Sequence, residues 1–450
     1  MWTRDDAKKL CEEILARSPA DGTEIVISAA RGNSLRLAES GPSEQNALSE
    51  LSIDLRLIRG GRQGRARASS SAPEALQQAI DAAWTSAEFA PELTLPPLAG
   101  ESQSSDGGQD FEQAKALAEH AQATKVAELE PYLTRVRESG AVATGFYETK
   151  GESLSYATSS GCFRHAYTGT GGFSSTVLKG DGAGVGHVIA HGRALSEAEV
   201  DAAGQRALDK CLASMNPIEV EAKAWPVLLE PRPVSDLLLF LASAGLGARA
   251  FLEGRSFLSN KIGERVLSDK MSIRDDGHLA SFARPGFDLE GQDRKAVTLI
   301  EGGVARGVVW DRVTAAEGQT ESTGHAGLQP SARGPIPSSL MLEAAGPSSQ
   351  DMMAKLGDGL LVTQFHYINL SEPLPVVVTG MTRNGTFLVE DGKVKHAVKN
   401  MRFTQSLVEA FRDVTAIGDD PTLCEAFFGG SIQTRSMVLP AFTFTSSTSF

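Results

Sequence analysis

The 450-residue sequence is poor in cysteine, and its four cysteines lie far apart: Cys11, Cys162, Cys211 and Cys424. No two of them form a CxxC pair. This distribution excludes a disulfide framework and a zinc ribbon, which both need paired or clustered thiols. Cys11 and Cys211 fall on the apolar stripes of expected helices, so we predict buried, unreactive thiols there.

Long apolar runs are also missing. The longest, Leu237 to Ala248, falls well short of the roughly 20 residues that a membrane helix needs. The start of the chain has no apolar stretch behind a basic residue, so it does not resemble a secretory signal. These absences predict a cytoplasmic protein without a membrane partner.

The chain has fewer basic than acidic residues, with 43 Lys+Arg and 56 Asp+Glu, and its net charge is −13. Such a chain repels nucleic-acid phosphates at long range. One expected hairpin nevertheless concentrates five arginines: Arg56, Arg59, Arg62, Arg65 and Arg67. No aromatic side chain lies between them to stack on a base, so we expect a solvated face or a surface for an acidic partner, and no direct nucleic-acid contact.

Helices and strands alternate in the first half. Apolar periodicity predicts helices over residues 3–18, 71–90, 111–137 and 196–215. Residues 24–28 and 51–58 read as strands, and 138–180 alternates like a hairpin. Residues 91–110 are rich in proline, glycine and serine, which predicts a mobile linker between two helix–hairpin–helix units.

From residue 222 onward short strands and tight turns predominate, with helices expected near 234–251 and 404–417. Asn384-Gly385 and Asp391-Gly392 are typical turn pairs, and they predict a strand over 386–390 between them. The fold class that follows is α+β with two domains. Residues 1–221 would form an N-terminal α/β domain, and 222–450 a C-terminal domain built on an antiparallel sheet.

His187 and His191 have the spacing at which a helix brings two imidazoles to one zinc ion. Helices tolerate glycine poorly, yet glycines surround the pair: Gly180, Gly182, Gly184, Gly186 and Gly192. In a strand the two histidines would lie roughly 13 Å apart, too far for one ion. We therefore expect a strand or loop without metal, and the role of the pair stays open.

Asp288 and Glu290 share one face of an extended segment, where they could act as acid and base or hold a cation. The neighbouring Arg284 and Arg294 favour a structural ion-pair network instead. The sequence contains no nucleophile elbow, phosphate-binding loop or dinucleotide fingerprint. The residues by themselves predict no catalytic centre.

A series of short blocks in the second half resembles the TldD/PmbA family, once called modulators of DNA gyrase. The blocks occur in family order at residues 253–257, 261–265, 275–277, 287–291, 299–302, 322–324, 381–385, 390–393 and 400–403. The resemblance covers roughly 225–420. It implies a two-domain fold and a place in a cytoplasmic peptidase complex, in which a zinc-bearing TldD subunit pairs with a TldE (PmbA) subunit to degrade or trim peptides and unfolded chains.

In the zinc subunit of that family, HExxxH lies on a helix shortly before the block that matches Lys261 to Glu264. The corresponding helix here, Leu237 to Gly247, contains neither histidine nor glutamate. Cys424 also lacks the glycine-rich setting of the family's third zinc ligand. The chain thus resembles the metal-free TldE/PmbA type, and we expect no metal or catalytic residue in it and zinc in its partner.

The matching blocks also suggest which residues contact peptide or the partner subunit: Arg255, Glu264, Asp288, Glu290, Thr323 and His325. Peptide would bind in extended form along sheet edges, since main-chain pairing is indifferent to sequence. Two alternatives stay open. One is an autonomous hydrolase that uses His187, His191 or the Asp288/Glu290 pair; the other is a stand-alone peptide-binding homodimer.

Overall fold

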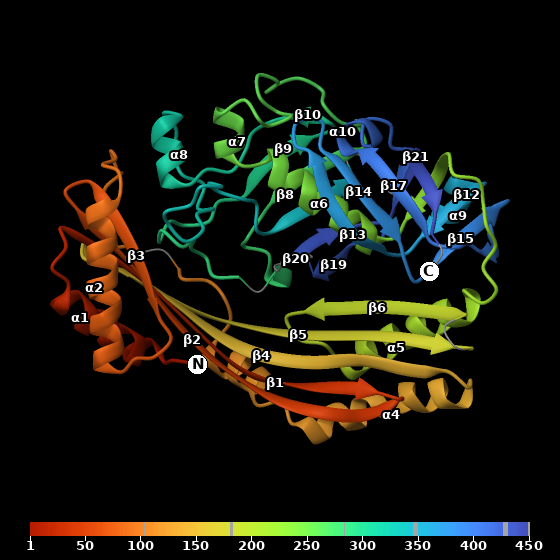
Figure 1. Cartoon of the computed structure of the whole chain (residues 1–450), viewed down its shortest axis with the longest axis horizontal. Coiled ribbons are helices and arrows are strands. Elements are labelled where there is room, and N and C mark those ends of the chain that lie inside the picture. The colour runs from red at the N-terminus through yellow and green to blue at the C-terminus, as the bar shows by residue number, and fades with distance from the viewer. Residues whose placement is uncertain (103–104, 181–182, 283, 345–349, 426–430, 449–450) are drawn as a thin grey trace.

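The computed structural model describes the chain except residues 103–104, 181–182, 283, 345–349, 426–430 and 449–450. The fold is α+β, as predicted, with 26% helix and 40% strand. Figure 1 shows one long N-terminal sheet facing a C-terminal half that contains two further sheets. Among the described residues, no helix combines the length and the hydropathy needed to cross a bilayer.

The N-terminal sheet is antiparallel, with the strand order β3-β2-β1-β4-β5-β6. Its strands are β1 (Gly22–Ala38), β2 (Gly41–Arg59), β3 (Arg62–Ala68), β4 (Val142–Thr158), β5 (Phe163–Lys179) and β6 (Gly184–Gly192). β1 and β2 are much longer than the predicted strands, because main-chain pairing between them continues through residues 44–50, which are mostly polar. Apolar alternation could reveal only the part of each strand that contributes to a core.

Five helices accompany this sheet: α1 (Arg4–Arg17), α2 (Pro73–Phe89), α3 (Phe111–Ala118), α4 (Gln122–Glu138) and α5 (Glu197–Ala213). Helical segments precede and follow each set of three strands along the chain, and the central pair β1–β4 joins the two sets. The predicted repetition of a helix–hairpin–helix unit is therefore present as a pattern of elements.

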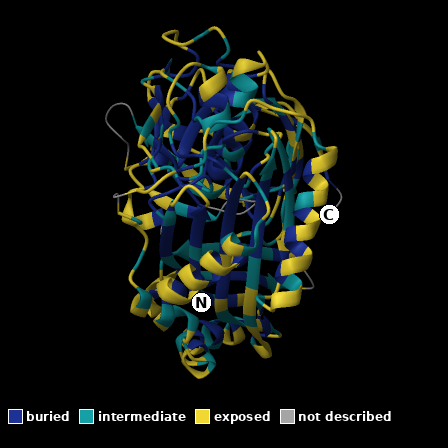
Figure 2. Cartoon of the chain, turned by 90° about the vertical axis from the view of Figure 1, so that its left-hand side faces the viewer, coloured by how far each residue is buried: buried dark blue, intermediate teal, exposed yellow. Residues whose placement is uncertain are grey.

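The two faces of the sheet have different partners, because alternate residues of a strand point to opposite sides. On β1, Ile25 and Ile27 belong to a core shared with α1 and α2, and Leu35 belongs to one shared with α4 and α5. Val26 points the other way and packs with Phe287 of the C-terminal half. Helices thus cover one face, and Figure 2 shows their exposed outer sides beside largely buried strands.

The C-terminal half contains two sheets. The order in the first is β10-β9-β8-β11-β20-β19, and in the second β13-β14-β17-β21-β7-β12-β15-β16, with β18 paired to β21. The strands are β7 (Ala224–Leu229), β8 (Met271–Asp275), β9 (Val297–Glu301), β10 (Val304–Ala305), β11 (Leu340–Ala344), β12 (Gly359–Val362), β13 (Phe365–Glu372), β14 (Val377–Thr382), β15 (Thr386–Glu390), β16 (Lys393–Ala397), β17 (Met401–Ser406), β18 (Ala416–Ile417), β19 (Thr422–Glu425), β20 (Ser431–Thr434) and β21 (Met437–Ser447).

The helices of this half are α6 (Pro231–Gly245), α7 (Ala248–Leu252), α8 (Arg312–Glu317), α9 (Met352–Leu356) and α10 (Leu407–Ala410). Helix α6 lies in the core between the two sheets, since its leucines share one cluster with Ile273 of β8 and Phe442 of β21. A helix enclosed on all sides must be apolar nearly all round. That requirement explains the run of leucines that begins at Leu237.

The turn pairs at Asn384-Gly385 and Asp391-Gly392 have positive φ at all four positions, and the strand between them, β15, has the predicted bounds. The expected helix over 404–417 is wrong. Thr404 and Gln405 pair with β14, so the chain stays extended through Ser406. Only after the Ser406 side chain caps the next turn does the short α10 form.

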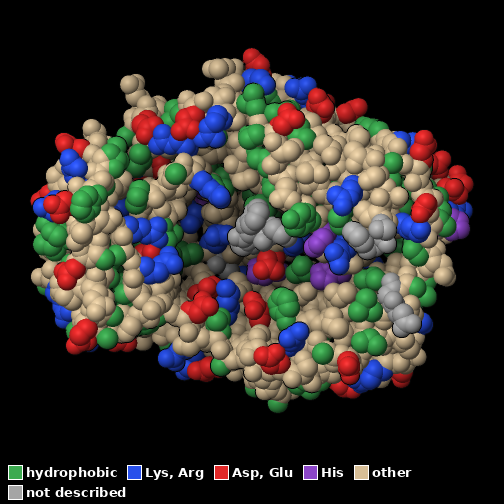
Figure 3. Space-filling model, viewed as in Figure 1, with side chains coloured by type: hydrophobic (Ala, Val, Ile, Leu, Met, Phe, Trp, Pro, Cys, Tyr) green, Lys and Arg blue, Asp and Glu red, His purple; other side chains and the backbone are tan. Residues whose placement is uncertain are grey.

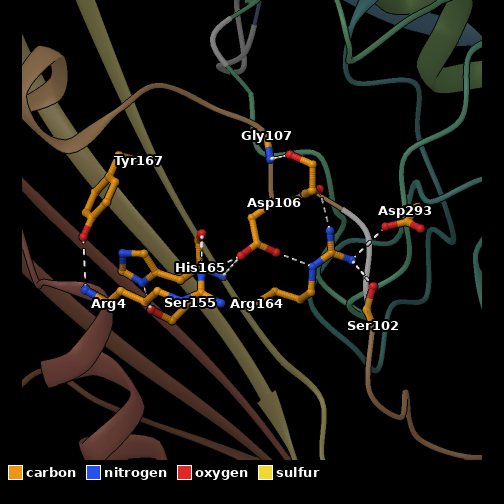
Figure 4. A network of polar contacts seen from close by, with 10 residues as sticks. Arg4, Ser102, Asp106, Gly107, Ser155, Arg164, His165, Tyr167 and Asp293 are labelled. Atoms are coloured by element: carbon orange, nitrogen blue, oxygen red, sulfur yellow. Dashed lines mark hydrogen bonds and ion pairs between the residues drawn. The ribbon is translucent and has the colours of Figure 1, made fainter.

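A buried arginine links the two halves (Figure 4). The Arg164 side chain on β5 is 1% exposed, and it forms ion pairs with Asp106 and, at 2.8 Å, with Asp293. Its guanidinium also lies 4.9 Å from the centre of the Phe287 ring. Because a buried charge needs such partners, these segments constrain one another's positions.

The segment 91–110 contacts both halves near its C-terminal end. Gly107 forms a β-bridge with Pro285, and Gln109 forms one with Tyr167. The division into domains 1–221 and 222–450 stays a prediction, with β7 beginning just after the proposed boundary.

Close packing at this junction makes Gly291 a sensitive position. Its φ is +72°, and an added Cβ would lie 2.4 Å from the Tyr156 ring. We expect Gly291→Ala to lower the free energy of unfolding by about 3 kcal/mol, because backbone strain and overpacking add. Gly263→Ala is the matched control, with φ +88° and no atom within 4 Å, and should cost about 1 kcal/mol. Urea unfolding measures both, and equal losses would contradict the packing argument.

Candidate functional site

The molecule is hollowed between the N-terminal sheet and the C-terminal half, and Lys and Arg side chains gather around the hollow in Figure 3. A cavity of about 580 Å³ lies on the sheet face that turns toward the C-terminal half. Residues 28–30 of β1, 49–52 of β2 and 152–154 of β4 line it, together with Pro285. This hollow, which both halves border, is a candidate binding region.

A second cavity, of about 400 Å³, lies beside strand β6. Its walls include His187 and Ile189 of β6, Lys210 of α5, Arg232 of α6 and Cys424 of β19. β6 is the last strand of its sheet, and β19 is the last strand of one C-terminal sheet. Two sheet edges therefore approach one another at this cavity.

The main chain of β6 presents hydrogen-bonding groups at this edge. The Val185 amide donates to Ser214 Oγ at 2.7 Å, and the Val185 carbonyl accepts from the same hydroxyl at 2.9 Å, so both groups point away from β5. Main-chain groups in a strand alternate in direction. Those of His187, Ile189 and His191 therefore point outward too, and no main-chain bond from the described residues reaches them.

Of the strand or loop expected for His187 and His191, the structure has a strand. His187 Nδ1 is 2.9 Å from Thr176 Oγ1, and His191 Nε2 is 3.0 Å from Ser431 Oγ. Burial, assisted by the charges of Arg232 and Lys210, lowers the pKa of His187 to about 4. Burial also lowers the pKa of His191. Both rings are neutral at pH 7 and serve as hydrogen-bonding groups along the cavity.

The residues on helix α6 do not fit a zinc ion. Its inward side chains include Leu237, Leu238 and Leu241, all fully buried in the apolar core. Burial raises the pKa of the nearby Cys424 thiol to about 11, which opposes the thiolate form that binds metal. Within the described part of the chain, no three His, Cys, Asp or Glu side chains cluster closely enough to hold a metal.

Asp288 and Glu290 lie in a tight turn, and the expected ion pairs with Arg284 or Arg294 are absent among the described residues. The Asp288 carboxylate instead accepts main-chain N–H bonds from Glu290 and Gln292, both at 2.9 Å, and from Ala326 at 2.8 Å. Turn geometry, which the sequence pattern did not reveal, gives Asp288 a structural role.

Thr323 and His325 belong to a buried chain of hydrogen bonds. Thr323 Oγ1 lies 2.9 Å from His325 Nδ1, and His325 Nε2 lies 2.9 Å from Asp275 Oδ1. The remaining oxygen of Asp275 accepts from the Ser339 amide at 2.7 Å. His325 and Asp275 are almost fully buried, so this chain of hydrogen bonds ties together the segments that carry Asp275, Thr323 and Ser339.

Arg255 and Glu264 lie apart from the other predicted residues, on the exposed connection after α7. Arg255 pairs with Glu253 near the surface. Two large apolar residues of the same connection, Leu252 and Ile262, are 39% and 47% exposed. We call the exposed residues of 252–264 the 252–264 surface.

The arginine hairpin is not simply solvated. Arg56 is buried and binds Glu24 through two bonds of 2.9 and 2.7 Å. Arg65 and Arg67 share Asp54, and Arg59 lies over the Trp84 ring. Most of this positive charge is matched inside the protein, which agrees with the expectation of no nucleic-acid contact but leaves it untested.

Comparison with known proteins defines the class. A family model for the PmbA/TldA metallopeptidase C-terminal domain matches residues 222–446, half of the chain. The chain is 22% identical to the metalloprotease PmbA of Escherichia coli O157:H7 over 436 residues, which cover 95% of this chain and 92% of that protein. These matches define a metallopeptidase-like protein.

Solved structures share the whole fold. TldE from Thermococcus kodakarensis superposes with a TM-score of 0.82 and 20% identity, over 98% of this chain and 99% of that one. A Thermotoga maritima protein that carries the name of a DNA gyrase modulator gives 0.83 and 16%, over 98% and 100%. The chain belongs to the PmbA/TldD family, as its short sequence blocks predicted.

Glu290 generates a pH prediction. Burial and the neighbouring carboxylates Asp288, Asp311 and Glu24 raise the pKa of Glu290 to about 8. The folded protein therefore keeps a proton that an unfolded glutamate loses above about pH 4.3, and stability falls as the pH rises from 5 to 8. Glu290→Gln should remove about 3 kcal/mol of this loss, measured by urea unfolding at several pH values.

The exposed Glu264→Gln provides the control and should leave the wild-type pH profile unchanged. If Glu290→Gln and wild type lose stability in parallel between pH 5 and 8, Glu290 is ionised throughout and the assignment is wrong.

Proposed function

We propose that this chain is the metal-free, non-catalytic TldE-type subunit of a cytoplasmic zinc peptidase complex. Its role would be to enclose the reaction chamber and to bind peptides or unfolded chains for a TldD-type partner that carries the zinc. Family membership and the similarity to TldE over nearly the whole chain support this proposal.

The observation that carries the proposal is the composition and burial of α6. The sequence resemblance places the zinc subunit's HExxxH on this helix, and here the helix presents leucine and phenylalanine to an apolar core. A zinc hydrolase needs nitrogen, sulfur or carboxylate ligands and a base to activate water. Apolar side chains supply neither, so hydrolysis would depend on the partner.

Peptide binding is assigned to the outer edge of β6. The outward N–H and C=O groups of His187, Ile189 and His191 can pair with an added strand. The adjoining cavity accommodates side chains, and its mixture of neutral histidines with charged Lys210 and Arg232 favours no single residue type. An edge of this kind suits unstructured substrates of varied sequence.

Replacing Ile189 by proline tests this edge directly. Proline removes the outward N–H, and edge strands tolerate it where that group faces away from the sheet. Ile189→Pro should weaken binding of a labelled unstructured peptide about tenfold in fluorescence polarisation. Ile189→Thr keeps the N–H and a β-branched side chain, so it should bind like wild type; equal affinities for all three proteins would exclude strand pairing at β6.

The 252–264 surface is proposed as the contact with the zinc subunit. Exposed Leu252 and Ile262 offer apolar area, and Arg255 and Glu264 offer charge of both signs at its margin. Interfaces combine an apolar centre with a polar rim.

Co-expression with a zinc-bearing family member tests the assembly. We expect a stable complex, zinc recovered with the partner, and peptide cleavage by the pair but not by this chain. Ile262→Asp should weaken the complex at least tenfold in calorimetry, because it places a charge in the apolar centre. Val394→Asp, at a comparably exposed position on β16, should not.

Two results would contradict the proposal. Stoichiometric zinc and peptide cleavage by the chain alone would establish an autonomous hydrolase. Peptide binding by a homodimer that ignores every zinc-bearing relative would establish a stand-alone binding protein.

A further inference from the structure

Two arginines beside the hollow lack the carboxylate partners that buried arginines normally have. Arg284 and Arg294 are both half-buried, and neither forms an ion pair with a described residue. The Nε atom of each is buried without a hydrogen-bond acceptor. Other arginines of the junction differ: Arg56 and Arg164 each bind carboxylates directly.

The described polar groups around Arg294 include no carboxylate that contacts it. Among the described residues, Arg294 donates to two neutral oxygens, Ser338 Oγ at 2.8 Å and the Gly324 carbonyl at 3.3 Å. Ser339 Oγ is buried without a partner. It and Arg294 converge on Gly277, where an added Cβ would lie 3.6 Å from Ser339 Oγ and 2.9 Å from Arg294 Cδ.

Asp275, Asp288 and Glu152 attract the pair electrostatically, but none of them forms an ion pair or hydrogen bond with either guanidinium, and their oxygens have other partners. Asp275 binds His325 and the Ser339 amide, and Asp288 accepts three main-chain bonds. Glu152 lies near Arg284 but bonds with Lys150 on its own strand. Burial and the charge of Arg294 lower the pKa of Arg284 to about 10, so both side chains remain cationic at pH 7.

The pair adjoins the proposed peptide-binding region. Arg284 precedes Pro285, which lines the cavity of about 580 Å³ together with Glu152. The charge of Arg284 also contributes to the lowered pKa of His191, the last histidine on the β6 edge. Arg284 is therefore near enough to the end of the β6 edge to act electrostatically on His191.

We propose that Arg284 and Arg294, with Ser339 Oγ, form a carboxylate-binding site that holds the C-terminal carboxylate of a bound peptide. Guanidinium groups match a planar carboxylate with paired N–H donors, and such charge-assisted bonds are strong where water is excluded. This site rests on the proposed function, because it requires that the chain binds a peptide. An acidic side chain presents the same chemical group, and the test distinguishes the two sources.

Two neighbouring guanidinium groups that no described carboxylate contacts directly are unfavourable in the free protein, since like charges repel and burial removes water. A bound carboxylate would neutralise the pair and supply the acceptors that the two Nε–H groups and the Ser339 hydroxyl lack.

The test uses the full chain and three labelled eight-residue peptides of alanine, serine and threonine. One has a free C-terminal carboxylate, one has a C-terminal amide, and one is amidated with a single internal glutamate. We expect the free carboxylate to bind about tenfold tighter than the amide in fluorescence polarisation. Arg284→Gln and Arg294→Gln should abolish this difference, and the exposed control Arg306→Gln should retain it.

The glutamate peptide identifies the source of the carboxylate. Affinity close to that of the amide assigns the site to the peptide terminus, whereas affinity equal to that of the free acid assigns it to any carboxylate. Equal binding of acid and amide peptides by wild type would overturn the site and leave the proposed function intact.

A thermal measurement separates the two proposals if no peptide binds. Acetate, compared with chloride at equal ionic strength, should raise the melting temperature of wild type but not of Arg284→Gln. Without acetate, Arg284→Gln should melt at a higher temperature than wild type, because it removes one of two repelling charges. A cooperative melting transition also shows that the variant folds. Stabilisation by acetate without peptide binding would refute the peptide role of β6 while retaining the anion site; no effect of acetate would overturn the site itself.

Discussion

The arrangement of the two halves depends on the burial of one guanidinium group. Arg164 is 1% exposed on β5, and a buried charge without partners would cost several kcal/mol. Its partners come from two other segments: Asp106 follows the proline-rich connection, and Asp293 lies in the turn after Phe287. Neither segment can move away without exposing or isolating that charge. The sheet face and the C-terminal half are thereby held a fixed distance apart, and the hollow is the space left between them.

Charge at this junction is distributed unevenly, and the difference has functional meaning under our proposals. Glu24, Arg56 and Tyr156 satisfy one another on the sheet, with Tyr156 donating to Glu24 at 2.7 Å. Arg284 and Arg294 are left without such partners among the described residues. Under our proposal, a bound carboxylate would supply the hydrogen-bond acceptors that these two arginines lack.

The sequence predicted those features that local chemistry determines. Apolar periodicity located most helices. The Asn-Gly and Asp-Gly pairs located the ends of β15, because the preference of these residues for a positive φ is local and does not depend on the rest of the fold. The lengths of β1 and β2 were not predictable in this way, since their polar parts are held by main-chain bonds to neighbouring strands. The helix expected over 404–417 failed for the same reason, because pairing with β14 outweighs local helical preference.

Predictions about the site divide along a similar line. The surrounding glycines correctly indicated that His187 and His191 do not lie on a helix. The partners of Asp288 could not be inferred, because its acceptors are filled by main-chain groups that only the folded turn brings together. The lack of a direct partner for Arg284 was equally unpredictable. Five acidic or basic residues lie within residues 284–294 and suggested mutual ion pairs, but the fold directs each carboxylate elsewhere.

Helix α6 explains how a peptidase-like fold could serve without a metal. A helix enclosed between two sheets contributes most to stability when every inward position is apolar, at roughly 25 cal/mol per Å² of buried surface. Metal ligands at such positions would require polar groups in the core, which only a bound ion can compensate. If the zinc belongs to a partner subunit, this helix is free to maximise packing, and the rigid frame that results positions the β6 edge. In the proposed complex, the apolar packing that leaves no metal ligand on this helix would make the chain a firm platform for holding the substrate.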